Sequence, residues 1–247
     1  MPDIGAALSP LAWPVALGVL GLVFGSFIAT VAIRWPASAL GGRSACDGCG
    51  RTLAPVELAP LLGYLILRGR CRTCGAEIAP IHPAVEALAT LAGIAAGLVA
   101  PGWAGVAGAV FGWQLLLLAA IDLRTFRLPH LLTGLLAASG FALGTPPPAD
   151  RLIGGIAGFV VLWLVAESYR RCRGRVGLGG GDPRLFGAIG LWLGWAALPG
   201  VLLVASVTGL VWALGLRLRA TDRLPFGPML AAGGFASWLH AASLAGY

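Results

Sequence analysis

Four cysteines in this sequence have the spacing of a metal site. Cys46-Asp-Gly-Cys49 and Cys71-Arg-Thr-Cys74 form two C-x-x-C pairs with 21 residues between them. This spacing is typical of tetrahedral Zn²⁺ coordination by four thiolates, and the glycine after each pair allows a tight turn. Four protein ligands leave no position for a substrate, so we expect structural zinc that largely folds a small loop. Two disulfides, a redox pair and unligated thiols are the alternatives.

Two aspartates lie where apolar segments end. Asp122 follows the apolar segment 103–121, and Asp182 precedes the segment 185–198. The order of the apolar segments places both aspartates at the same membrane face. Two carboxylates at close range do not both ionise easily, so one tends to hold a proton while the other acts as a base. Such a pair could activate a water molecule against a peptide carbonyl.

Each aspartate also has an interpretation without catalysis. Asp182 is followed by Pro183 and could cap a helix. Asp122 could form an ion pair with Arg124 or Arg127. The two acids could instead be a proton relay in a transporter. The spacing does not choose among these possibilities.

The segments that must position these residues are apolar. Hydrophobic residues make up 58% and charged residues 11% of the 247 positions, and the mean hydropathy is +0.87. A soluble domain would carry roughly a quarter charged residues, so this composition excludes a soluble enzyme, a disordered protein and a disulfide scaffold. We expect an all-α polytopic membrane protein with about eight transmembrane helices, at residues 11–33, 84–100, 103–121, 131–143, 152–169, 185–198, 201–216 and 226–245.

The basic residues predict the orientation of the chain. All 17 are arginines, and they contribute to a formal net charge of +7. If residue 1 lies outside, sixteen of the 17 fall in the loops 34–83, 122–130, 170–184 and 217–225, and only Arg151 lies outside. The positive-inside rule makes those loops cytoplasmic, so the charge reflects a lipid bilayer rather than nucleic acid. The expected domains are a first transmembrane helix (1–33), a cytoplasmic Cys₄ zinc loop (34–83) and a seven-helix membrane domain (84–247).

The motifs around these residues resemble those of the bacterial type IV prepilin peptidases. The shared segments cover nearly the whole chain and have the family's order: Gly25-Ser-Phe27 with Arg34-Trp-Pro36, Leu67-Arg-Gly-Arg-Cys71, Ile121-Asp-Leu-Arg-Thr-Phe-Arg-Leu-Pro129, Gly179-Gly-Gly-Asp-Pro-Arg-Leu185 and Leu224-Pro-Phe-Gly-Pro228.

The resemblance implies a membrane aspartic endopeptidase of the G-x-G-D class in the bacterial inner membrane, with Asp122 and Asp182 as its catalytic residues. Its substrates would be precursors of type IV pilins or type II secretion pseudopilins, which carry a short basic leader ending in glycine. In the family, the released amine is then methylated from S-adenosylmethionine. The sequence assigns no residues to that cofactor.

The chain departs from the family pattern at several positions. Ala29, Leu58, Ile81 and His82 replace residues of the usual pattern in and near the loop, which bears on methylation. His130 stands where aspartate usually follows Leu-Pro, and Arg184 replaces the usual lysine. Two alternatives to the peptidase are a non-catalytic zinc-loop scaffold for pilus or secretion assembly and a proton-coupled transporter.

Overall fold

The computed structural model describes residues 11–36, 44–175, 177–219, 222 and 224–246. The chain folds into two compact units, Met1–Ala109 and Val110–Tyr247. The first contains the four cysteines and the second contains both aspartates.

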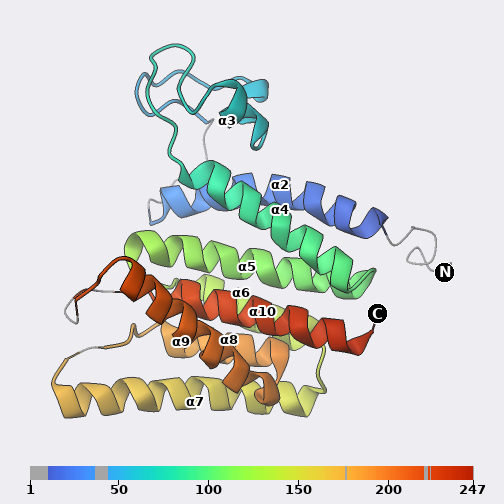
Figure 1. Ribbon diagram of the computed structural model, residues 1–247, viewed down its shortest axis with the longest axis vertical. Coiled ribbons are helices and arrows are strands. Elements are labelled where there is room, and N and C mark those ends of the chain that lie inside the picture. The colour runs from blue at the N-terminus through green and yellow to red at the C-terminus, as the bar shows by residue number, and fades with distance from the viewer. Residues whose placement is uncertain (1–10, 37–43, 176, 220–221, 223, 247) are drawn as a thin grey trace. The chain divides into compact units, whose positions relative to one another are not determined.

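The first unit has two long helices that pack side by side, α2 (Ala12–Arg34) and α4 (Ile81–Val99) (Figure 1). Their backbones approach closely because glycines face the partner helix. A Cβ atom on Gly21 would lie 2.4 Å from the carbonyl oxygen of Ala89, and one on Gly93 would lie 2.2 Å from that of Leu17. Small residues at helix contacts allow dense packing in membranes, where apolar side chains gain little from leaving lipid.

The chain between α2 and α4 forms the cysteine loop. It contains a short 3₁₀ helix, η1 (Pro55–Leu58), and a short α-helix, α3 (Leu62–Ile66). Two antiparallel bridges, Ala45 with Thr52 and Arg70 with Glu77, each close around one C-x-x-C pair. Little regular structure holds this loop, as expected of a segment that a metal folds.

The second unit is a helical bundle with the twelve-residue helix α8 inside it. Its elements are α5 (Trp103–Thr125), which begins in the first unit, α6 (His130–Leu143), α7 (Pro148–Arg173), α8 (Asp182–Leu193), η2 (Trp195–Ala197), α9 (Leu198–Gly215) and α10 (Gly227–Ala245). Helix α8 contacts α6, α7 and α10.

The α8 side chains form the core of this unit. Leu185, Ile189 and Trp192 have no exposed surface. The Trp192 indole N–H donates to the carbonyl oxygen of Leu136 on α6 at 2.9 Å. The backbones of α8 and α7 nearly touch, because a Cβ atom on Gly190 would lie 2.2 Å from the Gly154 carbonyl oxygen. This packing fixes the position of α8 and therefore of Asp182, its first residue.

Five helical segments of the described chain are long and apolar enough to cross a membrane: α2, α4, α5, α7 and η2 with α9. The all-helical membrane class is therefore supported, whereas the count of eight stays a prediction. Helices α6 and α8 have only 14 and 12 residues. At 1.5 Å per residue, 12 residues extend about 18 Å, less than the roughly 30 Å of a hydrocarbon core. Most α8 residues of the apolar segment 185–198 are buried inside the bundle, whereas Trp195 is 52% exposed.

Candidate active site and metal centre

Asp122 lies in the last turn of α5 and is 5% exposed. Its Oδ2 accepts a hydrogen bond of 3.0 Å from the backbone N–H of Gly227, the first residue of α10. A Cβ atom at position 227 would lie 2.7 Å from that oxygen, so only glycine allows this approach. The start of a helix favours negative charge through its free N–H groups. No ion pair joins Asp122 to Arg124 or Arg127 among the described residues, so the carboxylate is held by backbone.

Asp182 is the first residue of α8 and is 4% exposed. Its Oδ2 accepts a hydrogen bond of 2.8 Å from the backbone N–H of Gly179. The helix cap is Gly181 rather than Asp182, so the capping interpretation does not describe this side chain. Gly181 lies against the α5–α6 connection, since a Cβ atom there would be 2.7 Å from the Cβ of Leu128. The glycines before Asp182 thus let its loop pack closely and supply an N–H donor.

The fold brings the two aspartates together. The carboxylate of Asp122 interacts electrostatically with that of Asp182, although the residues lie on different helices. Each Oδ2 is held by one backbone N–H, whereas neither Oδ1 has a hydrogen-bond partner among the described residues and neither is sealed from solvent. Two neighbouring carboxylates in a mostly buried site favour a state that holds one proton between them. Hydrolysis needs one general acid and one general base that water can reach, and a singly protonated pair of aspartates supplies both.

Two departures from the family pattern contact each other beside this pair. The Arg184 guanidinium, in the first turn of α8, donates to the ring of His130 at the start of α6. Both residues are exposed. His130 is thus a hydrogen-bond partner of Arg184.

The four cysteines predicted as metal ligands lie together. The Sγ atoms of Cys46, Cys49, Cys71 and Cys74 all fall within 4.8 Å of one another, and those of Cys46 and Cys74 are 3.6 Å apart. Zn–S bonds of about 2.3 Å in a tetrahedron place sulfur atoms roughly 3.8 Å apart, so the arrangement fits a zinc ion. All four are free thiols, and 3.6 Å is far longer than a disulfide bond of about 2.05 Å.

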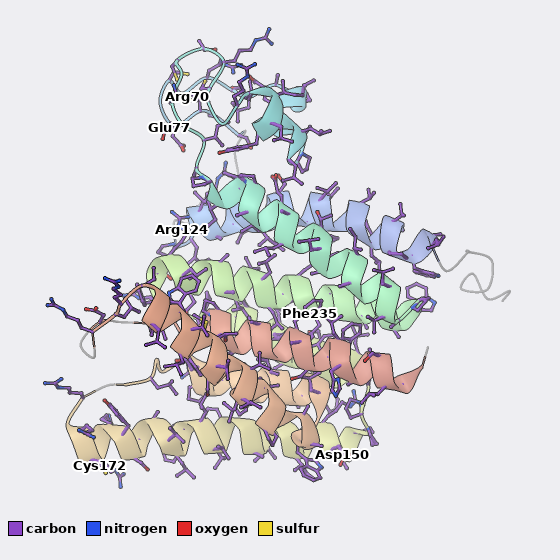
Figure 2. The ribbon with its side chains drawn as sticks, viewed as in Figure 1. Arg70, Glu77, Arg124, Asp150, Cys172 and Phe235 are labelled. Atoms are coloured by element: carbon purple, nitrogen blue, oxygen red, sulfur yellow. The ribbon has the colours of Figure 1, made fainter. Side chains whose placement is uncertain are left out.

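Each C-x-x-C pair forms the same kind of turn. The Gly50 N–H donates to the Cys46 carbonyl oxygen at 2.8 Å, and the Gly75 N–H donates to that of Cys71 at 2.9 Å. Both glycines have positive φ angles of 70° and 72°, which other residues rarely adopt. Backbone N–H groups of Cys74 and Thr73 lower the pKa of the Cys71 thiol to about 6, whereas burial and the neighbouring thiols raise the pKa of Cys74 to about 11. The fifth cysteine, Cys172, is exposed near the end of α7 (Figure 2) and is not one of the four clustered thiols.

Two carboxylates hold the cysteine loop in place. Glu57 in η1 forms an ion pair of 2.7 Å with Arg51 and also accepts the N–H of Ala54. The Arg51 guanidinium holds the pKa of Glu57 below its usual value, with help from the Ala54 N–H. Glu86 on α4 accepts the backbone N–H of Leu61 at 2.7 Å, which ties the loop to the helix pair. The sequence does not predict Glu86 as a site residue, because a backbone N–H partner leaves no pattern of residue types.

Comparison with known proteins places the chain in a family. Residues 19–99 match the bacterial peptidase A24 N-terminal domain, and residues 109–214 match the type IV leader peptidase family. A prepilin leader peptidase/N-methyltransferase from Burkholderia pseudomallei (strain K96243) is 40% identical, over 96% of this chain and 91% of the relative. No solved structure matches the chain.

Two further relatives with the same name agree with this match. One from Aeromonas salmonicida (strain A449) is 38% identical over 80% of this chain and 71% of its own length. One from Pectobacterium carotovorum subsp. carotovorum is 36% identical over 93% of this chain and 94% of its own length. The chain therefore belongs to the type IV leader peptidase family and is an enzyme, a prepilin peptidase. The resemblance seen in the sequence motifs is confirmed.

Proposed function

We propose that this enzyme cleaves the leader peptide from type IV prepilins or type II secretion pseudopilins, with Asp122 and Asp182 as its catalytic pair. The observation that carries the proposal is that these two nearly buried carboxylates lie near enough to interact electrostatically, and each has one oxygen left for water or substrate. Glu86 is the only other buried acid of the described chain, and it lies in the first unit.

The mechanism follows from a pair that shares one proton. The ionised aspartate accepts a proton from a water molecule, whose oxygen forms a bond to the scissile carbonyl carbon. The protonated aspartate donates its proton to the carbonyl oxygen, which gives a tetrahedral intermediate. When the C–N bond breaks, the proton taken from water passes to the leaving amine, and one hydroxyl of the intermediate returns its proton to the other aspartate as the carboxyl product forms. The pair then again holds one proton, so no net charge is consumed.

The backbone donors have a defined part in this mechanism. The N–H groups of Gly227 and Gly179 each occupy an Oδ2 atom, which leaves the Oδ1 atoms to handle protons. They also stabilise negative charge in a site with little solvent, where a fixed dipole acts more strongly than in water. Removal of a general acid or base typically costs about 10²- to 10⁴-fold in rate.

The membrane placement is part of the proposal. We place the chain in the bacterial inner membrane with eight spans and with residue 1 outside. Both aspartates then lie at the cytoplasmic face, where a membrane-anchored precursor exposes its leader. Five candidate spans and the clustering of arginines in four loops support it. Among those arginines, Arg43 and Arg223 lie outside the described residues, as do residues 1–10 at the expected outer end.

The proposed second activity is N-methylation of the new amino terminus from S-adenosylmethionine, in association with the loop unit. The relatives' shared name includes this activity. Cys46, Cys49, Cys71 and Cys74 would hold a structural zinc, which supplies folding energy to a loop with little core. Two of the departures from the family pattern, Leu58 and His82, line a cavity beside this cluster.

Cleavage by purified full-length protein tests this function. A prepilin-like peptide with a basic leader ending in glycine is incubated with wild type or Asp182→Asn, and the products are weighed by mass spectrometry. We expect truncation after the leader glycine by the wild type and none by the variant. Asp150→Asn is the matched control, because Asp150 is a half-buried acid in the first turn of α7 (Figure 2), and its Oδ1 accepts the Trp195 indole N–H, which the asparagine Oδ1 can still accept. Cleavage by Asp182→Asn at the wild-type rate would contradict the proposal.

A further inference from the structure

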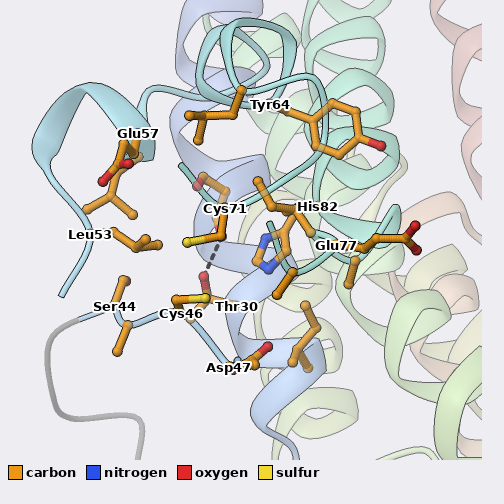
Figure 3. Close-up of a pocket in the computed structure, with 18 of the residues that line it drawn as sticks. Thr30, Ser44, Cys46, Asp47, Leu53, Glu57, Tyr64, Cys71, Glu77 and His82 are labelled. Atoms are coloured by element: carbon orange, nitrogen blue, oxygen red, sulfur yellow. Dashed lines mark hydrogen bonds between the residues drawn. The ribbon is translucent and has the colours of Figure 1, made fainter. Parts of the chain in front are cut away.

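The first unit contains a cavity of about 270 Å³ that the peptidase mechanism does not use. It lies between the end of α2, the cysteine loop and the first turns of α4. Figure 3 shows the His82 ring pointing in toward its middle and Cys46 and Cys71 on its wall. Apolar side chains such as Ile33, Leu53 and Leu67 complete the lining. Its volume is close to the lower end of small-molecule pockets, about 300 Å³, so it accommodates one end of a ligand.

Negative charge gathers around this cavity in an otherwise basic chain. Four of the chain's ten acidic residues line it: Asp47, Glu57, Glu77 and Glu86. Two of the four have cationic partners, since Glu57 pairs with Arg51 at 2.7 Å and Glu77 pairs with Arg70 at 3.8 Å. Arg34 and His82 are the basic side chains of the lining.

Glu86 is the acid whose position needs an explanation. It is 5% exposed, and no ion pair of the described residues includes it. Its Oε2 accepts only the backbone N–H of Leu61, at 2.7 Å. Its Oε1 has no hydrogen-bond partner among the described residues and is not sealed from solvent, so this oxygen is reached from the cavity. A buried carboxylate is costly unless it is paired, and one neutral N–H compensates only part of that cost.

We infer that the cavity binds the cationic end of an organic ligand and that Glu86 is its counter-ion. The buried carboxylate supplies the charge, the free Oε1 supplies the contact, and side chains such as Ile33, Leu53 and Leu67 supply apolar surface for the organic part of the ligand. The inference rests on the proposed methylation. That reaction brings two organic cations to the enzyme, namely the sulfonium of the methyl donor and the α-ammonium of the processed chain. Both present the same chemistry to Glu86.

Binding measurements on the full-length protein in detergent test the inference without requiring turnover. One arm compares S-adenosylmethionine with S-adenosylhomocysteine, which lacks the sulfonium charge. The other compares an apolar pentapeptide that has a free amino terminus with its N-acetylated form. We expect the wild type to prefer the cation at least tenfold in one arm, which also identifies the source of the cation. Glu86→Gln should abolish that preference.

Two controls keep the test decisive. The amide oxygen of the introduced glutamine can still accept the Leu61 N–H, so Glu86→Gln should keep the zinc content of the wild type. Glu77→Gln removes an acid of the same cavity that is exposed and already paired, and it should leave the preference unchanged. A wild type without preference in either arm, or a preference that persists in Glu86→Gln, would overturn the inference. Failure of the proposed methylation would be seen separately, as a processed chain whose mass does not change when the wild type is given S-adenosylmethionine.

Discussion

The backbone N–H of Gly227 donates to the Oδ2 of Asp122 across 105 residues of sequence, at 3.0 Å. The contact joins the end of α5 to the start of α10 and explains the segment Leu224-Pro-Phe-Gly-Pro228. The glycine is required because any Cβ would collide with the carboxylate. Pro228 follows at the second position of the helix, where its missing N–H is no loss.

Gly227→Ala should therefore slow leader cleavage without unfolding the protein. The added methyl group moves the N–H away from Asp122, and loss of a hydrogen bond to a charged group costs about 1.5–3 kcal/mol, or about 10- to 100-fold in rate. Initial cleavage rates of purified protein measure this. Gly134→Ala is the control, because a Cβ at that position in α6 meets no atom within 4 Å. Equal rates for the two alanine variants would show that the Gly227 contact does not support catalysis.

Zinc should depend on the loop cysteines and on no other cysteine. Cys46→Ser should lose the metal, since it removes one of four thiolates from a site that folds its own loop. Cys172→Ser should keep it, because that thiol is outside the cluster. Metal content per chain is measured by mass spectrometry, and loop folding by limited proteolysis.

The same zinc-deficient variant tests whether leader cleavage, which we assign to the second unit, depends on zinc in the first unit. Asp122 and Asp182 belong to the second unit, so Cys46→Ser should keep leader cleavage within the wild-type order of magnitude. A complete loss of cleavage together with zinc would mean that the peptidase site depends on the loop. Full zinc content in Cys46→Ser would show that the cluster does not hold the metal.

The close contact of α7 with α8 should make Gly190 intolerant of a side chain. In Gly190→Ala the new methyl group would meet the Gly154 backbone, so the helices must separate, at a cost of about 1–3 kcal/mol for overpacking. We expect a lower thermal unfolding temperature, with Gly134→Ala again as the control. Cleavage should fall as well, because α8 carries Asp182. Unchanged stability and activity would mean that α8 is held less tightly than its burial indicates.

The contact between His130 and Arg184 should accept the residue that is usual in the family. His130→Asp turns the hydrogen bond into an exposed ion pair, worth about 0.2–1 kcal/mol, and should preserve cleavage. His130→Lys places two cations together and should raise the salt dependence of the cleavage rate, because ions screen their repulsion. Identical salt dependence in the lysine variant and the wild type would argue against this contact.

The sequence predicted which cysteines and which aspartates lie together. It did not predict the backbone groups that hold the aspartates. The spacing of Cys46, Cys49, Cys71 and Cys74 is local and implies their clustering, and membrane topology places Asp122 near Asp182 despite their separation. The donors of Gly227 and Gly179 leave no such pattern, because backbone N–H groups are present at every residue except proline. Only the motifs around these glycines gave a signal, and it did not specify a role.

Helix α8 shows that an apolar segment does not have to face lipid. Its leucine, isoleucine and tryptophan side chains are as apolar as those that face lipid, yet they are covered by α6, α7 and α10. Hydropathy measures the preference of a side chain for leaving water and does not distinguish lipid from protein as the destination. Glu86 shows a second limit of sequence patterns. It is a single acid in an apolar helix, and the sequence gives no sign of the cavity beside it.

The most direct test of the account is a double-mutant comparison of cleavage rates for wild type, Asp122→Asn, Asp182→Asn and the variant with both changes. If the two aspartates act as one unit, each single change should lower the rate about 10³-fold or more, and the double change should lower it little further. Zinc content and unfolding temperature should match the wild type in all three variants. A single variant that keeps the wild-type rate, or two losses that simply multiply in the double variant, would contradict a shared catalytic pair.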